Sequence, residues 1–233
     1  PPPPLFFFTP TPASAILSGL VGSEMCIRDS KVSGKSVTIG ATTKHAEVAA
    51  SKDVKKAIPA LAKLAGNIGD AQVRNRGTIG GSISNNDPSA CYPSACMALN
   101  AVIHTNKRKI DADKFFTGMF ETALKSGELV EAVEFEIPEK ADYQKHPNPA
   151  SRYAIIGVFV AKHKKDVNVA VTGAKSCVYI DQDLSKKLSS NFSVSAIEGM
   201  EVKSSGMNSD MHASAEYRAN LVSLYAKKAV EAC

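Results

Sequence analysis

The sequence predicts an α+β fold in two parts, and three patterns along its 233 residues support this prediction. Residues 31–142 combine short stretches that alternate apolar and polar side chains with segments of helical spacing. Two stretches rich in Val, Ile and Tyr, 153–162 and 167–180, flank a polar turn and predict an antiparallel pair of strands. An amphipathic segment, 214–232, predicts a terminal helix.

The first part opens with a predicted strand and two predicted helices. Ser36–Gly40 alternates apolar and polar residues and ends in glycine, which is typical of a short strand. Thr42 or Thr43 could cap a helix that continues to Ala50, and Ser51 or Asp53 could cap a second. Pro59 falls inside the apolar stripe of that second segment, which predicts a kink or a late start there. Two glycines, Gly66 and Gly69, end it.

The rest of the first part is predicted to alternate between loops, helices and strands. Residues 70–87 are polar and glycine-rich, which indicates a loop, and Pro88 is placed to begin a helix that Asp87 would cap. The sequence then predicts strands at 101–105 and 129–137, on either side of a helix at 113–124.

A change in composition at 139–151 predicts the boundary between the two parts. This stretch is polar and carries two prolines, so we expect one domain over 31–142 and a second over 143–233. In the second, Gly173 would be a bulge or a break in its strand. The terminal helix would bury one face, made of Tyr217, Leu221, Leu224, Tyr225 and Ala229.

Composition excludes several classes of function. The net charge of +5 comes from scattered lysines with no interleaved aromatic residues, so we expect no nucleic-acid binding. The five cysteines show no C-x-x-C spacing and cannot be paired completely, which predicts a reducing, cytoplasmic location without an iron–sulfur cluster or zinc site of its own. No apolar run is long enough for a transmembrane helix.

Residues 1–30 are interpreted as a leader that does not belong to the folded protein. Four prolines, three phenylalanines and a Thr-Pro alternation suit neither helix nor strand, and a positive region before the apolar stretch is missing. Residues 21–30 resemble translated sequencing-adaptor read-through. On this interpretation the native sequence begins near Lys31, and the protein's own amino terminus has been lost.

The stretch 68–88 carries the chemistry. Gly77, Gly80 and Gly81 would permit positive φ and let backbone N–H groups approach an anion. Short polar side chains around them suit phosphate, ribose or the edge of a heterocycle. The alternative is a tight polar loop whose glycines serve turns only. The stretch is not a phosphate-binding Walker loop and lacks the G-x-G-x-x-G of a dinucleotide-binding fold.

Residues 68–88 closely resemble the second flavin-binding motif of the FAD-binding medium subunits of molybdenum hydroxylases, of the carbon monoxide dehydrogenase and xanthine dehydrogenase type. The core of that motif is Arg-Asn-x-x-Thr-Ile-Gly-Gly-Asn/Ser, present here as residues 74–82. The likeness extends to five further segments: 39–48, 115–118, 127–129, 149–154 and 214–218. The resemblance implies the second part of an FAD-binding domain of the vanillyl-alcohol-oxidase (PCMH) type, followed by a carboxy-terminal domain of antiparallel strands and helices.

The resemblance also implies a site and a function. Electrons would pass from iron–sulfur clusters on a small subunit, which drain a molybdenum-cofactor centre on a large subunit, through FAD to an external acceptor. Leu129 would pack near the flavin ring, and Lys145 would approach its polar edge. The remaining residues would line the diphosphate and ribityl region of FAD: Thr78, Ile79, Gly80, Gly81, Ser82, Asn85 and Asp87.

Two departures from the family pattern leave other interpretations open. Cys91 stands where the family often has an Asp that would bond FAD, and the family's first flavin motif, Ala-Gly-Gly-x-Ser, has no counterpart here. The alternatives are a subunit-interaction fragment with a defunct flavin site, and a self-contained flavin oxidase. Lys145 could equally be a solvent-exposed linker lysine. None of the five histidines is assigned a role, and the substrate and the electron acceptor stay undetermined.

Overall fold

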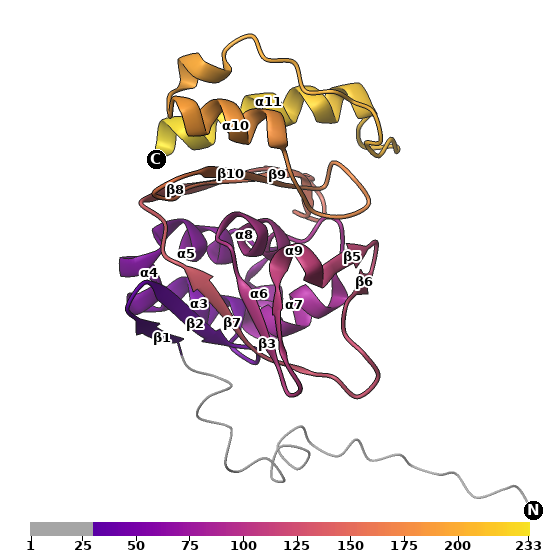
Figure 1. Ribbon diagram of the computed structural model, residues 1–233. Helices are drawn as coiled ribbons and strands as arrows, with labels where there is room; N and C mark the ends of the chain where they lie inside the picture. The colour runs from indigo at the N-terminus through magenta and orange to yellow at the C-terminus, as the bar shows by residue number, and fades with distance from the viewer. Residues whose placement is uncertain (1–29) are drawn as a thin grey trace, which may run out of the picture.

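The computed structural model describes residues 30–233, and the interpretation of residues 1–29 lies outside this range. Ser30, the last residue of the expected leader, begins the first strand. The molecule is built in four layers (Figure 1): a five-stranded sheet, a layer of helices, a four-stranded sheet, and two helices over the outer face of that sheet. The predicted α+β class is confirmed.

The first sheet contains five antiparallel strands in the order β1-β2-β7-β3-β4. Predictions for 36–40, 101–105 and 129–137 are confirmed to within a residue or so. The strands are β1 (Ser30–Ser33), β2 (Ser36–Gly40), β3 (Val102–Thr105), β4 (Lys109–Asp111) and β7 (Val130–Glu136).

The first helices begin where the sequence offers a cap. Lys44 precedes α3 (His45–Ala50), and its N–H donates to the Glu47 carboxylate, so the helix starts later than Thr42 or Thr43 would have placed it. Ser51 caps α4 (Lys52–Ala57) through the N–H of Val54, as predicted. Pro59 begins a separate helix, α5 (Pro59–Gly66), so the single helix predicted here is two helices divided just before this proline.

The prediction of a loop over 70–87 is wrong. Asp70 accepts a hydrogen bond from the N–H of Val73 and caps α6 (Ala71–Arg76). Thr78 accepts one from the N–H of Gly81 and caps α7 (Ile79–Asn85). Each helix is less than two turns long, too short to show a helical period in the sequence.

Two helix predictions fail, the first because a local hydrogen bond competes with the helix and the second because of a distant residue, Asn86. Asp87 does not cap a helix at Pro88; its carboxylate accepts from the N–H of Ser89 and holds a turn, and α8 (Tyr92–Ala98) begins four residues later. The helix predicted at 113–124 stops after α9 (Ala112–Phe115) and gives way to a hairpin of β5 (Phe116–Gly118) and β6 (Glu121–Thr122).

The second sheet is antiparallel in the order β11-β10-β9-β8 and separates the two layers of helices. The polar stretch chosen as the domain boundary forms its edge strand β8 (Lys140–Pro147), which pairs with β9 (Ala154–Lys162). Gly173 ends β10 (Val167–Thr172) with φ of +84°, so the predicted break is confirmed. The last strand is the short β11 (Tyr179–Ile180).

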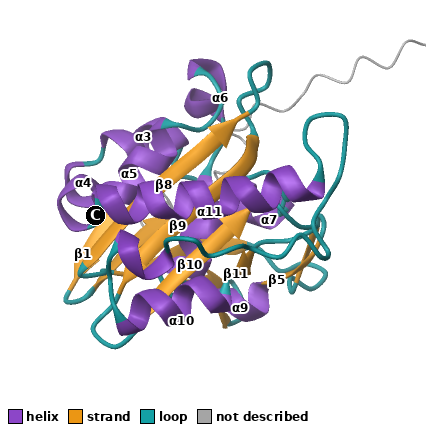
Figure 2. Ribbon diagram, turned by 90° about the horizontal axis from the view of Figure 1, so that it is seen from above, coloured by secondary structure: helices purple, strands orange, loops and turns teal. Residues whose placement is uncertain are grey.

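Two helices, α10 (Gln182–Ser190) and α11 (Ala215–Ala232), lie across the strands of the second sheet (Figure 2), with the 3-10 turn η2 (Val194–Ile197) between them in the chain. Ser214 caps α11 through the N–H of Tyr217, as the predicted start requires. The buried face is rotated from the prediction: Arg218 and Val222 are buried, whereas Tyr217 and Leu224 are about half exposed.

Apolar side chains from both sheets meet in one core around α5 and α8. It contains Ile39 and Phe135 from the first sheet, and Tyr143 and Phe159 from the second. A second core lies between the other face of the second sheet and the helices α10 and α11. The division into domains at 142/143 stays a prediction, although the first core crosses it.

Candidate functional site

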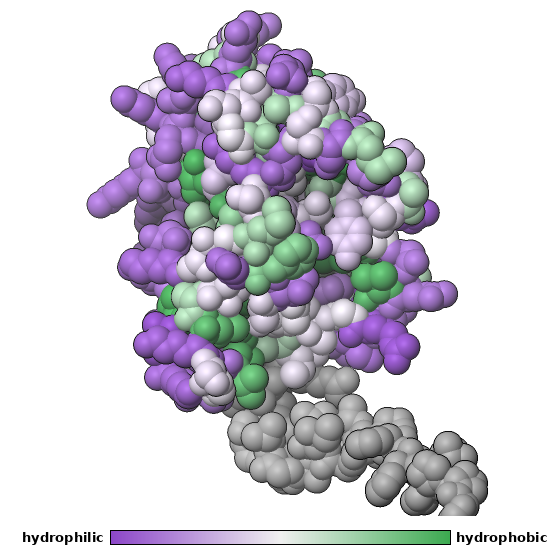
Figure 3. All heavy atoms as spheres, turned by 90° about the vertical axis from the view of Figure 1, so that its right-hand side faces the viewer, coloured by the Kyte–Doolittle hydropathy of each residue, from purple (hydrophilic) through white to green (hydrophobic). Residues whose placement is uncertain are grey.

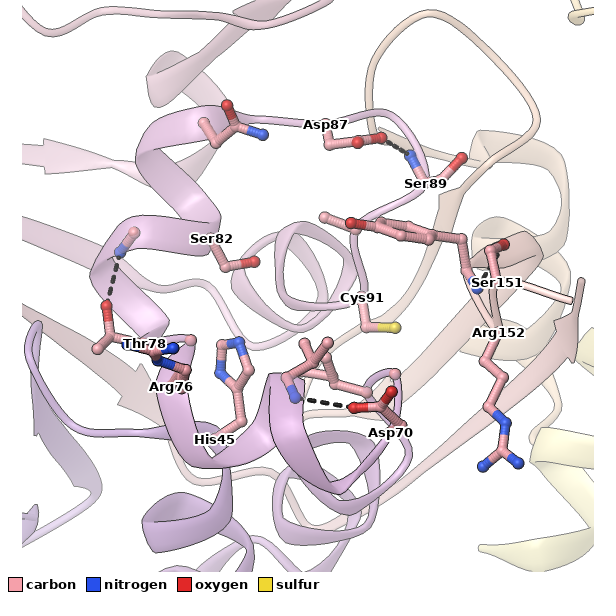
Figure 4. A pocket seen from close by; sticks show the side chains of 18 of the residues that line it. His45, Asp70, Arg76, Thr78, Ser82, Asp87, Ser89, Cys91, Ser151 and Arg152 are labelled. Carbon is pink, nitrogen blue, oxygen red and sulfur yellow. Dashed lines mark hydrogen bonds between the residues drawn. The ribbon is translucent and has the colours of Figure 1, made fainter.

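A cavity of about 650 Å³ lies where α6 and α7 face the turn between β8 and β9. Three segments line it together with His45 from α3: residues 68–78, residues 81–91, and Lys145 with residues 150–153. Figure 4 shows Thr78 and Ser82 on one side of the opening, with Cys91, Ser151 and Arg152 on the other. The cavity therefore joins segments of the chain that are distant in the sequence.

Six of the nine predicted site residues line this cavity: Thr78, Gly81, Ser82, Asn85, Asp87 and Lys145. Ile79 and Gly80, the first two residues of α7, are buried and do not line it. Leu129 precedes β7, is 66% exposed, and is also outside the lining.

The glycines of this segment serve close packing. None of Gly77, Gly80 and Gly81 has a positive φ, so that expectation is wrong. Gly80 donates its N–H to the carbonyl of Ala41, and a Cβ on Gly80 would lie only 2.5 Å from the Cβ of Ala41. A Cβ on Gly77 would lie 2.6 Å from Nε2 of His45. These two glycines let α7 sit against the end of β2 and let the His45 ring reach the cavity wall.

Lys145 is held at the cavity by neutral groups. Its Nζ donates to the carbonyls of Asn67 and Arg152 and lies 3.8 Å from Sγ of Cys91. No described carboxylate pairs with it. The side chain of Lys145 therefore does not extend into solvent as a linker lysine would. Its ammonium group brings a positive charge without an ion-pair partner to the cavity wall. Its two hydrogen bonds connect the loop after α5 to the turn after β8.

Cys91 supplies a neutral thiol to the same wall. The residue is 6% exposed, and burial raises the pKa of its thiol although the charge of Lys145 opposes that shift. A neutral thiol is a weak hydrogen-bond acceptor, so this position cannot bond a hydroxyl as a carboxylate would.

His45 was assigned no role from the sequence, yet its ring forms part of the cavity wall (Figure 4). The residue is 4% exposed, and burial lowers its pKa to about 4, so the ring is neutral at pH 7. His45 lies in segment 39–48, which shares the family likeness, but its place on the cavity wall depends on the packing of α3 against α6.

The two arginines of the motif differ in their contacts. Arg74 donates to the carbonyls of Ile68 and Gly69, which fixes the conformation of the loop before α6. Arg76 lines the cavity, and no hydrogen bond or ion pair of its side chain occurs within residues 30–233.

The loop that carries Leu129 is held rigidly although its side chain is exposed. Glu128 accepts hydrogen bonds from Arg108, Thr105 and the N–H of Lys125, and its side chain is fully buried. These contacts lower the pKa of its carboxyl from 4.5 to about 2, with Arg108 the largest cause. Asn106 forms two hydrogen bonds with the backbone of Leu129: its Oδ1 accepts from the N–H of Leu129, and its N–H donates to the carbonyl of Leu129.

Elsewhere the surface is mixed. On the side of β5 and β6, apolar side chains occur in small patches among polar ones (Figure 3). Within residues 30–233, no group of three or more His, Cys, Asp or Glu side chains is arranged to hold a metal ion. In the same range, no helix is long and apolar enough to cross a membrane.

Comparison with known proteins identifies the family. Residues 25–140 match the family described as the FAD binding domain in molybdopterin dehydrogenase. The nicotine 6-hydroxylase medium subunit of Paenarthrobacter nicotinovorans is 32% identical over 205 residues, which are 81% of this chain and 72% of that protein. The chain belongs to the FAD-binding medium subunits of molybdenum hydroxylases. The resemblance drawn from the sequence is thus confirmed, and with it FAD as the family's cofactor.

Other relatives agree with this family. The glyceraldehyde dehydrogenase medium chain of Sulfolobus acidocaldarius is 39% identical over 137 residues, 56% of this chain and about half (49%) of that protein. Among solved structures, quinoline 2-oxidoreductase from Pseudomonas putida 86 shares the fold, with a TM-score of 0.77 at 22% identity over 89% of this chain and 78% of that one. Carbon monoxide dehydrogenase from Hydrogenophaga pseudoflava gives 0.73 at 25% identity, covering 88% and 77%.

Proposed function

We propose that this chain is the FAD-binding electron-transfer subunit of a molybdenum hydroxylase complex. In it, electrons pass from iron–sulfur clusters on a small subunit, fed by a molybdenum-cofactor centre on a large subunit, to an external acceptor. The observation that carries the proposal is the convergence of six predicted FAD-binding residues on one cavity, from Thr78 to Lys145. We also assign the first part of the chain to the vanillyl-alcohol-oxidase type of FAD domain, and its location to the cytoplasm, where unpaired cysteines are stable.

The cavity residues fit a flavin nucleotide. Thr78, Ser82 and Asn85 offer hydroxyl and amide groups that suit the oxygens of a diphosphate and a ribityl chain. His45 adds a buried polar ring whose Nδ1 has no hydrogen-bond partner within the described protein. FAD, when bound, would supply the redox chemistry of the subunit.

The protein's own groups would tune that chemistry. Lys145, with no carboxylate beside it, would stabilise negative charge at the polar edge of the flavin by Coulomb attraction. Leu129 follows the buried Glu128, and Asn106 holds its backbone by hydrogen bonds. Its exposed side chain would pack against the flavin ring. The role of the chain is therefore to hold FAD and set its potential.

Cys91 favours a second candidate, a subunit-interaction fragment whose flavin site is defunct. Its neutral thiol cannot replace the Asp expected at this position. This interpretation requires that the chain bind no flavin.

The test is the visible absorption of the purified full chain with and without added FAD. A parallel sample carries, fused to its amino terminus, the Ala-Gly-Gly-x-Ser segment of a related medium subunit. We expect protein-bound flavin in at least the fusion. If neither sample retains flavin after gel filtration, the electron-transfer proposal is wrong and the interaction-fragment interpretation replaces it.

A further inference from the structure

His45 occupies a defined place on the wall of the cavity. It is the first residue of α3, and its N–H donates to the carbonyl of Gly77, 3.0 Å away. This bond ties α3 to the segment that enters α7. In Figure 4 the ring projects toward the space between Ser82 and Cys91.

The ring lacks hydrogen-bond partners within residues 30–233. Nδ1 is fully buried and unpartnered. Burial is the single cause of the lowered pKa of the ring, so no charge or hydrogen bond from residues 30–233 acts on Nε2. The ring of Tyr92 lies 5.3 Å away, centroid to centroid, tilted at 48° to the His45 ring. Buried polar side chains in folded proteins nearly always have a partner. Nε2 lies beside Gly77 on the wall of the cavity, so it is the ring nitrogen that a partner bound in the cavity can reach.

The protonation state of the His45 ring decides whether its partner accepts or donates a hydrogen bond. Burial keeps the ring neutral, and the charged residues that line the cavity, such as Asp70, Arg76 and Asp87, form no ion pair with it. A buried N–H without an acceptor is rarer in proteins than an under-used acceptor, so the single proton belongs on Nε2 and away from the enclosed Nδ1. Nε2 lies over the bare Cα of Gly77, at a place that a Cβ would obstruct.

We propose that Nε2 of His45 donates a hydrogen bond to an acceptor oxygen of the ligand in this cavity, in the part of FAD that carries the ribityl hydroxyls and the phosphates. This inference rests on the proposed function and adds a binding residue to it. Because the ring is neutral, His45 provides a directional hydrogen bond and no charge; the positive charges that line the cavity belong to Arg76, Lys145 and Arg152.

The first experiment compares His45→Phe with His45→Gln in the full chain. Phenylalanine keeps the ring and removes an unsatisfied polar group, so we expect the free energy of unfolding without ligand to be unchanged or higher. The dissociation constant of FAD should rise about tenfold, as for the loss of one hydrogen bond. Glutamine places an amide nitrogen near the position of Nε2 and should retain most of the affinity.

The matched control is His163→Phe. His163 is equally buried, but its Nε2 bonds the carbonyl of Ala98, and it lies outside the cavity lining. Its substitution should lower the stability and leave the FAD affinity unchanged. If His45→Phe behaves in this way, His45 is a structural residue and the inference is wrong.

The choice of ligand identifies the acceptor. FAD, FMN and riboflavin share the ribityl chain, whereas only the first two carry phosphate. A loss of affinity by His45→Phe for all three assigns the acceptor to the ribityl chain, and a loss restricted to FAD and FMN assigns it to a phosphate.

A last measurement separates this inference from the proposed function. If the wild-type chain binds no flavin, inorganic diphosphate is added and the ring nitrogen resonances of His45 are followed by NMR. A saturable shift would support His45 as a ligand donor although the flavoprotein proposal fails. The absence of a shift would overturn both.

Discussion

At the scale of single residues, the charge balance of the cavity depends on Cys91. Its Sγ lies 3.8 Å from Nζ of Lys145, within reach of an ion pair if a carboxylate stood there. Cys91→Asp would supply both a counter-charge for Lys145 and an acceptor for a flavin hydroxyl. We expect the dissociation constant of FAD to fall about tenfold in this variant, measured by fluorescence titration.

Cys91→Ala is the control, since it removes the thiol without adding an acceptor. Its FAD affinity should stay within about twofold of the wild type, because a neutral thiol contributes little as a hydrogen-bond acceptor. A wild-type chain that binds FAD more tightly than both variants would show that the thiol itself holds the ligand.

At the scale of elements, α7 depends on two adjacent glycines in different ways. An alanine Cβ at Gly80 would meet the backbone and Cβ of Ala41, which cannot move without displacing β2. We expect Gly80→Ala to lower the free energy of unfolding by about 1–3 kcal/mol in urea denaturation. At Gly81 the only near atom is Oγ1 of Thr78, 3.1 Å away on a side chain that can shift.

Gly81→Ala therefore serves as the matched variant in the same helix. Alanine's better helix propensity adds roughly 0.5–1 kcal/mol, so the stability should be unchanged or higher. Gly81 also lines the cavity, and the added methyl group should weaken FAD binding. Equal destabilisation by the two substitutions would contradict this account of the packing of α7.

The loop before β7 is an element held by one buried carboxylate. Glu128 has a folded pKa of about 2 against 4.5 in the free side chain, so the unfolded chain binds a proton first as the pH falls. Its stabilising contribution is complete above about pH 4.5 and is lost progressively toward pH 2. Glu128→Gln should be less stable at pH 7 and should flatten this part of the stability profile.

Urea denaturation from pH 2.5 to pH 7 measures this effect. Glu139→Gln is the control, because Glu139 is half exposed and its oxygen lies 3.5 Å from the Lys162 ammonium. The control should retain the acid dependence of the wild type. If Glu128→Gln retains it as well, another carboxylate is responsible.

The same elements show what the sequence could predict. Strands with a clear alternation and helices that begin at Ser51, Pro59 or Ser214 were found, because their signals are local. The helix predicted at 113–124 failed because of a distant residue. Asn86, buried and left-handed at φ of +44°, donates to the carbonyls of Gly118 and Glu121 and fixes a hairpin there.

The site could be predicted only in part for a similar reason. The motif around Thr78 is contiguous in the sequence, so a resemblance was enough to indicate it. His45 reaches the cavity through the packing of α3 against α6, and no local pattern marks that contact. The rotation of α11 has the same origin: Arg218 is polar in sequence, yet tertiary hydrogen bonds draw it inside.

At the scale of the whole molecule, the question is whether the two sheets unfold together. The core around α5 and α8 takes side chains from both, and the Lys63 ammonium in α5 pairs with Asp142 in β8 across the layers, 2.7 Å apart. Arg218 in turn fastens α11 to the second sheet through the carbonyls of Ile155 and Gly173 and through Asp210. This continuity of contacts predicts a single cooperative transition.

Arg218→Met tests this continuity, because it removes the buried guanidinium while keeping much of the side-chain volume. Two buried carbonyls would lose their donor, which should cost about 3 kcal/mol of unfolding free energy. If the molecule is one cooperative unit, hydrogen exchange in the first sheet, at β2 and β7, should accelerate as much as in β9 and β10. Acceleration confined to the second sheet and α11 would instead show that residues 31–142 and 143–233 unfold as separate domains, as the change in composition at 139–151 predicted.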